Sequence, residues 1–139
     1  MNRFENIDKE ILINNTYGNL WYYPDLKMVH HEFHKYCVGE PFREFLIKGQ
    51  EIITKTNCSK WLSDDRKVGL VSEEDRRWAS AHWIEKTVKA GWAHWALVKP
   101  KTAIGLMSIK QQLEYYSSLG INAKIFADPT DAMIWLKEQ

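Results

Sequence analysis

Several features that would mark a specialised class of protein are scarce or missing in this chain of 139 residues. Only two cysteines occur, Cys37 and Cys58, and their contexts are unrelated, which favours free thiols in a reducing cytoplasm over a disulfide framework. No apolar run reaches the roughly 18 residues of a membrane-spanning helix. Residues 1–10 lack the apolar core of a signal peptide. We therefore expect a cytoplasmic protein with no integral membrane segment.

An excess of one charge is also missing. The 19 basic and 18 acidic residues leave a formal net charge of +1. A chain that binds nucleic acid or an anionic membrane surface usually carries a strong positive field, which steers the polyanion toward it. We expect no nucleic-acid partner.

Motifs for cofactors and nucleophilic catalysis are lacking as well. The segment 68–72, "VGLVS", is not a glycine-rich phosphate loop. His82 and His94 have no Asp or Ser partner that the sequence makes visible, so no catalytic triad can be argued. The sequence predicts no catalytic residues and no cofactor.

The segment "HHEFH" has the composition of a metal site but not its spacing. On a strand, His30, Glu32 and His34 would face one side, and His31 and Phe33 the other. Zinc would need a further ligand with its supporting hydrogen bonds, and the helical HExxH spacing is absent. The pattern favours an exposed polar face on an edge-side strand, and we predict no metal.

What the chain does contain is typical of one globular domain. Hydrophobic residues make up 45% and charged residues 27% of the sequence. The length suits a single domain that spans residues 1–139, with no linker or repeat. Seven tryptophans are many for this size, and they predict either bulky core packing or an exposed contact surface.

Hydrophobic periodicity and turn residues predict an α/β fold. An N-terminal hairpin precedes alternating helices and strands, which indicates a mixed sheet that is parallel in its later part and carries about four helices. Strands are predicted at residues 10–15, 20–23, 28–33, 58–64, 92–98 and 122–127. Helices are predicted at residues 41–55, 72–91, 103–120 and 128–139.

The stretch "WLSDDRKVGLVSEED" at residues 61–75 contains the strongest polar candidates. Ser72 has the sequence context of a helix N-cap, with Asp75 three residues further on. Ser63, Asp64, Asp65 and Arg66 lie at the carboxyl end of a central strand, where open α/β sheets place ligand sites. We take these four residues as binding candidates, although adjacent Asp side chains usually diverge.

Two aromatic residues are predicted to point outward from their helices. If residues 72–91 form one continuous helix, Trp83 lies opposite the apolar stripe, at about 100° per residue. Tyr115 is turned away from its own stripe in the same manner. An outward Trp is costly unless it is covered, so Trp83 is a candidate contact for a partner or a second copy.

Over nearly its whole length the sequence resembles the STAS-like proteins called SpoIIAA-like, a group that borders on the STAS/SEC14 domains. The resemblance lies in "LWYYPDLKMVHHEF", "KWLSDDRKVGLVSEEDRRW" and the closing "IFADPTDAMIWLK". It implies a cytoplasmic α/β binding module without known catalysis. Better-characterised relatives are switched by phosphorylation at the start of the second helix, which here corresponds to Ser72, although "VSEED" departs from the Asp-Ser-Ser/Thr-Gly-Leu pattern. The SEC14 side implies a pocket for an apolar ligand.

Three hypotheses follow for the function. The leading one is a non-enzymatic regulatory domain that acts through a protein partner or self-association, with a switch at Ser72. The second is a module that binds a small apolar ligand or a lipid between the helices and the sheet. The third is a hydrolase-type enzyme that uses Asp64 and Asp65 together with the histidine segment.

Overall fold

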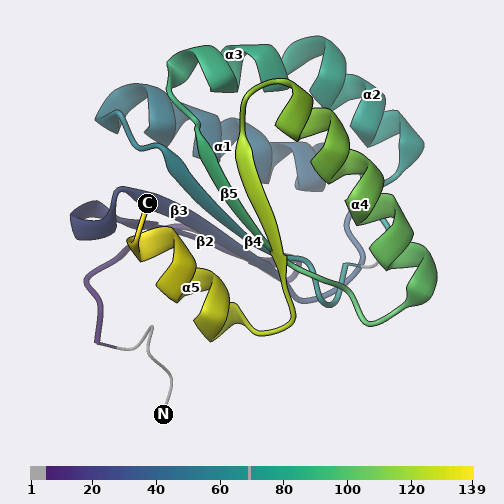
Figure 1. Cartoon of the computed structure of the whole chain (residues 1–139), viewed down its shortest axis with the longest axis horizontal. Coiled ribbons are helices and arrows are strands. Elements are labelled where there is room, and N and C mark those ends of the chain that lie inside the picture. Colours follow the sequence, from purple (N-terminus) through teal and green to yellow (C-terminus); the bar gives the residue numbers. More distant parts are fainter. Residues whose placement is uncertain (1–5, 69) are drawn as a thin grey trace.

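The computed structural model describes residues 6–68 and 70–139. It shows an α/β fold with one mixed sheet (Figure 1). The strands are β1 (Glu10–Asn14), β2 (Gly18–Tyr23), β3 (Met28–Phe33), β4 (Lys60–Asp64), β5 (His94–Val98) and β6 (Asn122–Phe126). The helices are α1 (Glu40–Thr56), α2 (Glu73–His82), α3 (Ile84–Ala90), α4 (Ala103–Ser118) and α5 (Pro129–Lys137).

The six strands of the sheet follow their order in the chain, from β1 to β6. The first three are antiparallel, and β3, β4, β5 and β6 are parallel. A short 3-10 helix at Pro24–Leu26 connects β2 to β3, where the Pro-Asp pair predicts a turn. The expected hairpin followed by parallel strands is confirmed. However, β3 lies inside the sheet between β2 and β4, so its predicted place at the edge is wrong.

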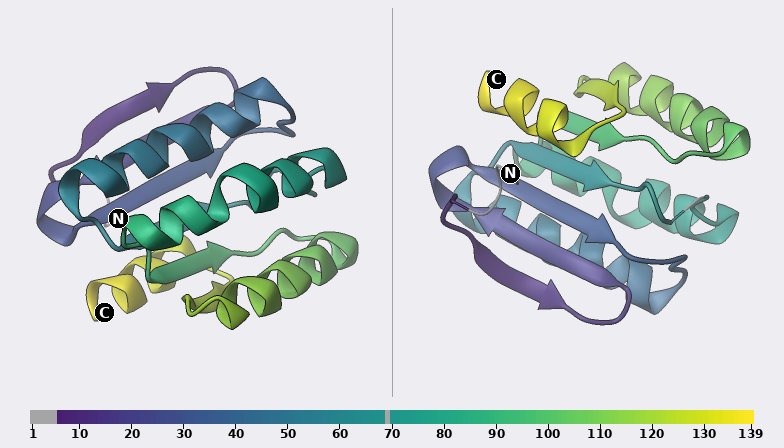
Figure 2. Two further views of the ribbon diagram at one scale, coloured as in Figure 1. Left: turned by 90° about the horizontal axis from the view of Figure 1, so that it is seen from above. Right: turned by 90° about the horizontal axis from the view of Figure 1, so that it is seen from below.

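The helices divide unequally between the two faces of the sheet. Helices α1 to α4 cover one face, and α5 alone covers the other (Figures 1 and 2). From β3 to β6, each parallel strand lies on the same side of the strand before it. Connections between parallel strands are right-handed, so helices in connections that run across the sheet in one direction lie on the same face. The face under α1–α4 is called the helix-rich face below, and the other the α5 face.

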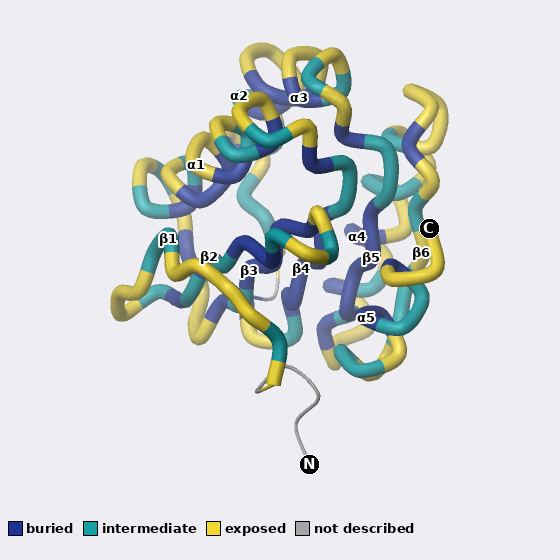
Figure 3. The backbone as a smooth tube through the Cα atoms, turned by 90° about the vertical axis from the view of Figure 1, so that its left-hand side faces the viewer, coloured by how far each residue is buried: buried dark blue, intermediate teal, exposed yellow. Residues whose placement is uncertain are grey.

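Each face has its own hydrophobic core, and the central strands are buried between them (Figure 3). The core of the helix-rich face is aromatic, whereas that of the α5 face consists mainly of small and aliphatic residues. The first includes Phe33, Phe45, Trp61, Trp83, Trp92 and Trp95. The second includes Met28, Leu62, Ala96, Val98, Met133 and Leu136.

The predicted helix over residues 72–91 is two helices, which corrects the expectation of about four. The backbone leaves helical geometry at Trp83, with φ −125° and ψ −51°, so α2 ends at His82 and α3 begins at Ile84. This break rotates Trp83 toward the sheet. Trp83 is only 4% exposed, and its predicted outward orientation is wrong. Tyr115 lies on the continuous helix α4 and is 46% exposed, as predicted.

Candidate functional site

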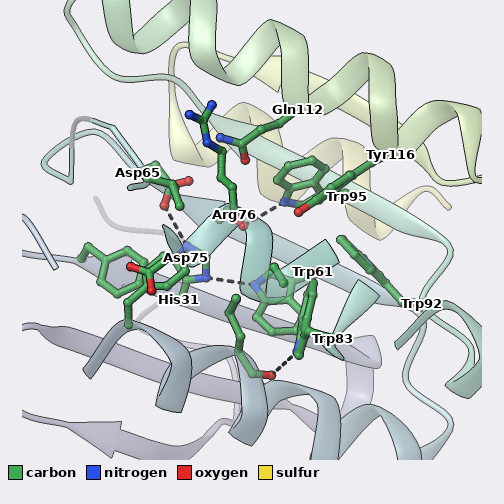
Figure 4. A pocket seen from close by; sticks show the side chains of 16 residues that line it. His31, Trp61, Asp65, Asp75, Arg76, Trp83, Trp92, Trp95, Gln112 and Tyr116 are labelled. Carbon is green, nitrogen blue, oxygen red and sulfur yellow. Dashed lines mark hydrogen bonds and ion pairs between the residues drawn. The ribbon is translucent and has the colours of Figure 1, made fainter. Parts of the chain in front are cut away.

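A cavity lies between the helix-rich face of the sheet and the helices α1, α2 and α4 (Figure 4). The volume of this cavity is about 50 Å³, which is room for roughly three to five water molecules. Most of its walls are aromatic, and a few polar groups interrupt them; we call it the aromatic cavity. Its lining includes Phe33, Trp61, Trp83, Trp92, Trp95, Tyr116, His31, Ser63, Asp65, Arg76 and Gln112.

Strand register brings the floor of the aromatic cavity together. Side chains alternate between the faces of a strand, so Trp61, Ser63 and Asp65 all point toward the helix-rich face. Ser63 is paired with His31 of β3, and Trp61 with Trp95 of β5. In a parallel sheet, paired residues share a face. Three strands therefore deliver polar and aromatic groups to one place.

A chain of hydrogen bonds runs through this floor from Trp61 to His31 to Asp65. The indole Nε1–H of Trp61 donates to Nδ1 of His31 at 3.0 Å. Because an indole can only donate, Nδ1 is an acceptor, and the proton of the neutral imidazole lies on Nε2. From Nε2, His31 donates to Oδ1 of Asp65 at 2.8 Å. All three residues line the cavity, but both ring nitrogens of His31 are bonded to protein groups, so Asp65 is the member of the chain that keeps an oxygen for a further donor.

Two residues with hydroxyl groups, Ser63 and Tyr116, also line the cavity. Ser63 Oγ accepts a hydrogen bond of 2.8 Å from the indole of Trp95. Tyr116 comes from α4, and its ring packs on Trp95 with a centroid separation of 4.8 Å. Burial raises the pKa of the Tyr116 phenol, and the neighbouring Tyr115 and the charge of Asp65 raise this pKa further. Both hydroxyls therefore stay protonated and can donate to a group inside the cavity.

Asp75 also lines the cavity, but its charge is already neutralised. Its carboxylate accepts from the backbone N–H of Gly39 at 2.9 Å, from Nε of Arg43 at 3.0 Å and from the Ser72 hydroxyl at 2.9 Å. Ser72 in turn accepts from the backbone N–H of Asp75, which confirms the predicted N-cap. Asp75 therefore ties the start of α2 to the start of α1.

Arg76 is different, although it follows Asp75 directly. It is half-buried, and its guanidinium forms no hydrogen bond or ion pair with any residue that the structure describes. Figure 4 shows this side chain extending from α2 toward Gln112 of α4. Oδ2 of Asp65 likewise has no hydrogen-bond partner among residues 6–68 and 70–139. The cavity thus contains one anionic and one cationic group whose bonding capacity is not used.

The other predicted acidic residue, Asp64, belongs to the α5 face. Its carboxylate is buried and accepts two bonds from its near neighbour Arg66, at 2.9 Å from Nε and 2.7 Å from Nη2. Asp64 and Asp65 therefore diverge, and they form no joint acid–base pair. The guanidinium of Arg66 is bound to Asp64, so the two residues form a structural ion pair.

His30 lies on the α5 face too, and the exposed polar face predicted for His30, Glu32 and His34 is wrong. His30 is buried, and its Nδ1 lies 3.1 Å from the hydroxyl of Tyr23. Burial lowers the pKa of His30 well below its ordinary range, and nearby positive groups lower this pKa further. His34 is exposed beyond the end of β3. No group of side chains suited to hold a metal ion occurs among the described residues.

The five predicted binding residues thus separate into two sites. Ser63, Asp65 and Trp83 line the aromatic cavity, whereas Asp64 and Arg66 lie on the opposite face. Since Ser63, Asp64 and Trp83 are buried, they cannot form an exposed contact surface. Ser72 lies just outside the cavity as the cap of α2.

Sequence reasoning missed His31, Arg76 and Tyr116 as members of the site. A usable signal existed for the strands, because the alternation of Trp61 and Ser63 on β4, continued by Asp65 just after it, matches that of His31 and Phe33 on β3. Aligning these two patterns would have paired His31 with the acidic segment. No comparable signal exists for Arg76 and Tyr116, because whether a helical residue reaches the cavity depends on how its helix lies on the sheet.

The chemistry of the site is that of binding through hydrogen bonds. Asp65 can accept, Arg76 can donate, and aromatic rings enclose the space between the walls. His31 lines the cavity but has no ring nitrogen to offer a substrate, because both are already bonded to protein groups.

No family model, curated protein or solved structure shows significant similarity to this chain. Among the helices that the structure describes, none is both long and apolar enough to cross a membrane.

Proposed function

We propose that this chain is a non-enzymatic binding domain that holds a small molecule, or the headgroup of a larger one, in the aromatic cavity. The observation that carries this proposal is the cavity itself, with aromatic walls and two polar groups of unused bonding capacity. Pockets that bind small molecules typically combine an apolar lining with a few convergent polar groups.

The size of the cavity limits what it can hold. Pockets for drug-sized ligands measure about 300–1,000 Å³, and the 50 Å³ here is far smaller. A group of about three to five non-hydrogen atoms would replace the water that fits there. A longer ligand would leave its remaining atoms outside the protein, on the side of Arg76 and Gln112. This differs from the spacious lipid pocket that a SEC14-type module would need.

The direction of the hydrogen-bond chain supports binding rather than turnover. In a hydrolytic triad the imidazole faces the substrate, and a carboxylate behind it fixes the ring. Here the order is reversed, because both ring nitrogens of His31 are bonded to protein groups and Asp65 keeps an oxygen for a further donor. The imidazole orients the carboxylate, which is an arrangement suited to holding a donor group in a fixed position.

A cavity-filling variant tests the proposal. Ala79 is buried in the cavity wall on α2, so Ala79→Leu should fill the space, whereas Ser80→Leu adds the same side chain on the exposed side. We expect propionamide, n-propylamine, propionate or β-alanine to shift the NMR signals of the cavity tryptophan indoles, and Ala79→Leu to remove the shift. Val71→Phe at the rim is a second blocking variant. The proposal fails if no probe shifts these signals, or if both blocking variants bind as the parent does.

A protein partner or self-association remains the second candidate, and one observation favours it. Helix α4 and its C-cap expose four large apolar side chains, which are successively three, eight and four residues apart: Ile104, Met107, Tyr115 and Leu119. Exposed apolar patches of this kind mark interaction sites. Light scattering of the parent and of Ile104→Lys/Met107→Lys, over a range of concentrations, tests this candidate. A monomeric parent that captures no partner argues against it.

The STAS-like resemblance, the cytoplasmic location and the switch at Ser72 also remain proposals. A phosphate on Ser72 would replace the hydroxyl that caps α2 and would place negative charge beside Asp75. Loosening of α2 would then open one wall of the aromatic cavity. Hydrogen exchange of α2, measured with and without phosphoserine at position 72, tests this switch, and equal exchange rates would argue against it.

A further inference from the structure

The charged groups of the aromatic cavity indicate which class of ligand it binds. Asp65 and Arg76 bear opposite charges and line the same small space, yet no ion pair joins them. Every other acidic or basic residue that lines the cavity is already paired, since Asp75 is held by Arg43 and backbone and hydroxyl donors. Two complementary charges thus line one cavity without contacting each other.

The two charges have different surroundings. Asp65 is buried, and a hydrogen bond from the neutral imidazole of His31 fixes one of its oxygens without cancelling its charge. Its second oxygen is available to a donor such as an ammonium group. The aromatic walls favour a cation there, because the faces of Trp and Tyr rings attract positive charge. A carboxylate ligand at this position would instead meet a like charge.

Arg76 lies on α2 and is half-buried, and it reaches over the cavity toward α4 (Figure 4). A guanidinium presents a planar fork of donors that matches the two oxygens of a carboxylate. Since no acidic side chain among residues 6–68 and 70–139 pairs with it, Arg76 is suited to hold a carboxylate that follows the ammonium group outward.

We infer that the ligand of the aromatic cavity is a small zwitterion of the amino-carboxylate class, with its ammonium group on Asp65 and its carboxylate on Arg76. This inference rests on the proposed function and specifies its ligand. The small volume is consistent with a ligand whose ammonium end alone is fully enclosed. Ser63 and Tyr116, which also line the cavity, complete the polar part of the site.

Affinities for matched probes test the inference. Glycine, β-alanine and 4-aminobutyrate vary the separation of the two charges, and n-propylamine and propionate each carry one of them. We expect the best amino carboxylate to bind at least about tenfold more tightly than either single-charge probe. Titration monitored by tryptophan fluorescence and by the indole N–H signals measures the dissociation constants.

Conservative variants identify the contacts. Asp65→Asn keeps an oxygen for His31 but removes the charge, and Arg76→Gln removes the guanidinium. Each should reduce the affinity for the amino carboxylate to that of a single-charge probe. Arg77→Gln is the matched control, since Arg77 is exposed and pairs with Glu73 on the outside of α2. Circular dichroism and thermal unfolding verify that each variant is folded.

The outcomes separate the two proposals. If n-propylamine or propionamide binds as tightly as every amino carboxylate, and Arg76→Gln changes nothing, the cavity is a binding site but the zwitterion inference is wrong. If no probe shifts the cavity signals, both proposals fail. A preference for β-alanine or a homologue that both Asp65→Asn and Arg76→Gln remove, and that Arg77→Gln retains, supports the inference.

Discussion

Asp64 and Asp65 are adjacent in the sequence, and they show how differently the two faces of the sheet treat a carboxylate. On the α5 face, the Asp64 carboxylate accepts three hydrogen bonds, all from the backbone and side chain of Arg66, a residue only two positions away. On the helix-rich face, Asp65 receives one bond from His31, which is 34 positions away, and keeps an oxygen for the cavity. The hydrogen bonds of Asp64 therefore come from a neighbour in the sequence. The one bond of Asp65 comes from a distant strand, and its second oxygen can accept a bond from a ligand.

The hydrophobic cores of the two faces also differ, in the size and shape of their side chains. Helix α5 packs small and aliphatic residues such as Ala132 and Leu136 onto Leu62 and Ala96, all of them fully buried. On the helix-rich face, flat and rigid rings meet at steep angles; Trp61 and Trp83, for example, are inclined at 83°. The helix-rich face contains the aromatic cavity proposed as the binding site, and a second pocket, whose lining includes His30, Asp64 and Arg66, lies on the α5 face.

The largest expected effect on stability comes from comparing two substitutions at adjacent positions whose side chains lie on opposite faces of the sheet. Leu62→Ala removes a fully buried side chain from the close-packed α5 face, and we expect a loss of about 2–5 kcal/mol in the free energy of unfolding. Ser63→Ala removes only the acceptor of Trp95 beside a cavity that water can enter, and should cost about 1 kcal/mol. Urea unfolding measures both. Equal losses would contradict the difference between the faces.

The packing of Trp61 can be disturbed from the other side, at Gly49 of α1. A Cβ atom at this position would overlap the ring of Trp61, which explains a glycine inside a helix. Overpacking costs about 1–3 kcal/mol, and the better helix propensity of Ala returns about 1 kcal/mol of it.

Gly49→Ala should therefore lower the free energy of unfolding by up to about 2 kcal/mol and shift the indole N–H signal of Trp61. Glu51→Ala, at an exposed position of the same helix, is the control and should change stability by less than about 0.5 kcal/mol. A more stable Gly49→Ala variant would show that the ring does not pack against α1.

The α5 face should respond to mild acid through His30. In the folded protein burial lowers the pKa of His30 well below its ordinary value of about 6.5, which the unfolded chain retains. Below pH 6.5 the unfolded chain therefore binds a proton that the folded protein does not, and stability falls as the pH falls. The slope reaches at most about 1.4 kcal/mol per pH unit.

Unfolding of the parent and of His30→Gln between pH 7.5 and pH 5 measures this contribution. We expect His30→Gln to flatten the pH dependence of the free energy of unfolding. An unchanged slope in His30→Gln would mean that the imidazole is protonated in the folded protein.

Much of the fold could be predicted from local patterns. The hairpin, the alternation of strands and helices, the N-cap at Ser72 and the central position of Trp61 and Leu62 are all confirmed. Each depends on turn residues, caps or periodicity, which act over a few residues. The thiols are buried as expected of structural cysteines, and burial raises the pKa of Cys58 to about 11.

Trp83 and Tyr115 show that local patterns do not always predict whether a helical side chain points outward or inward. The same helical geometry predicted both to point outward, and it was correct only for Tyr115, on the unbroken helix α4. At Trp83 the indole donates to the carbonyl of Leu46 at 2.7 Å and packs on Trp61 and Trp92. These distant contacts outweigh the backbone hydrogen bonds that a continuous helix would keep, and no local pattern reveals them.

The sequence by itself determined the order of strands and helices, the face to which each strand residue points and the divergence of Asp64 from Asp65. These depend on dihedral preferences and on an alternation that holds within one strand. Only the tertiary structure decided that His31 meets Asp65, that Trp83 turns inward and that Arg76 stays unpaired above an aromatic cavity. Those outcomes depend on how bulky rings from separate elements fill a shared space, and packing of this kind is settled by all the neighbours at once.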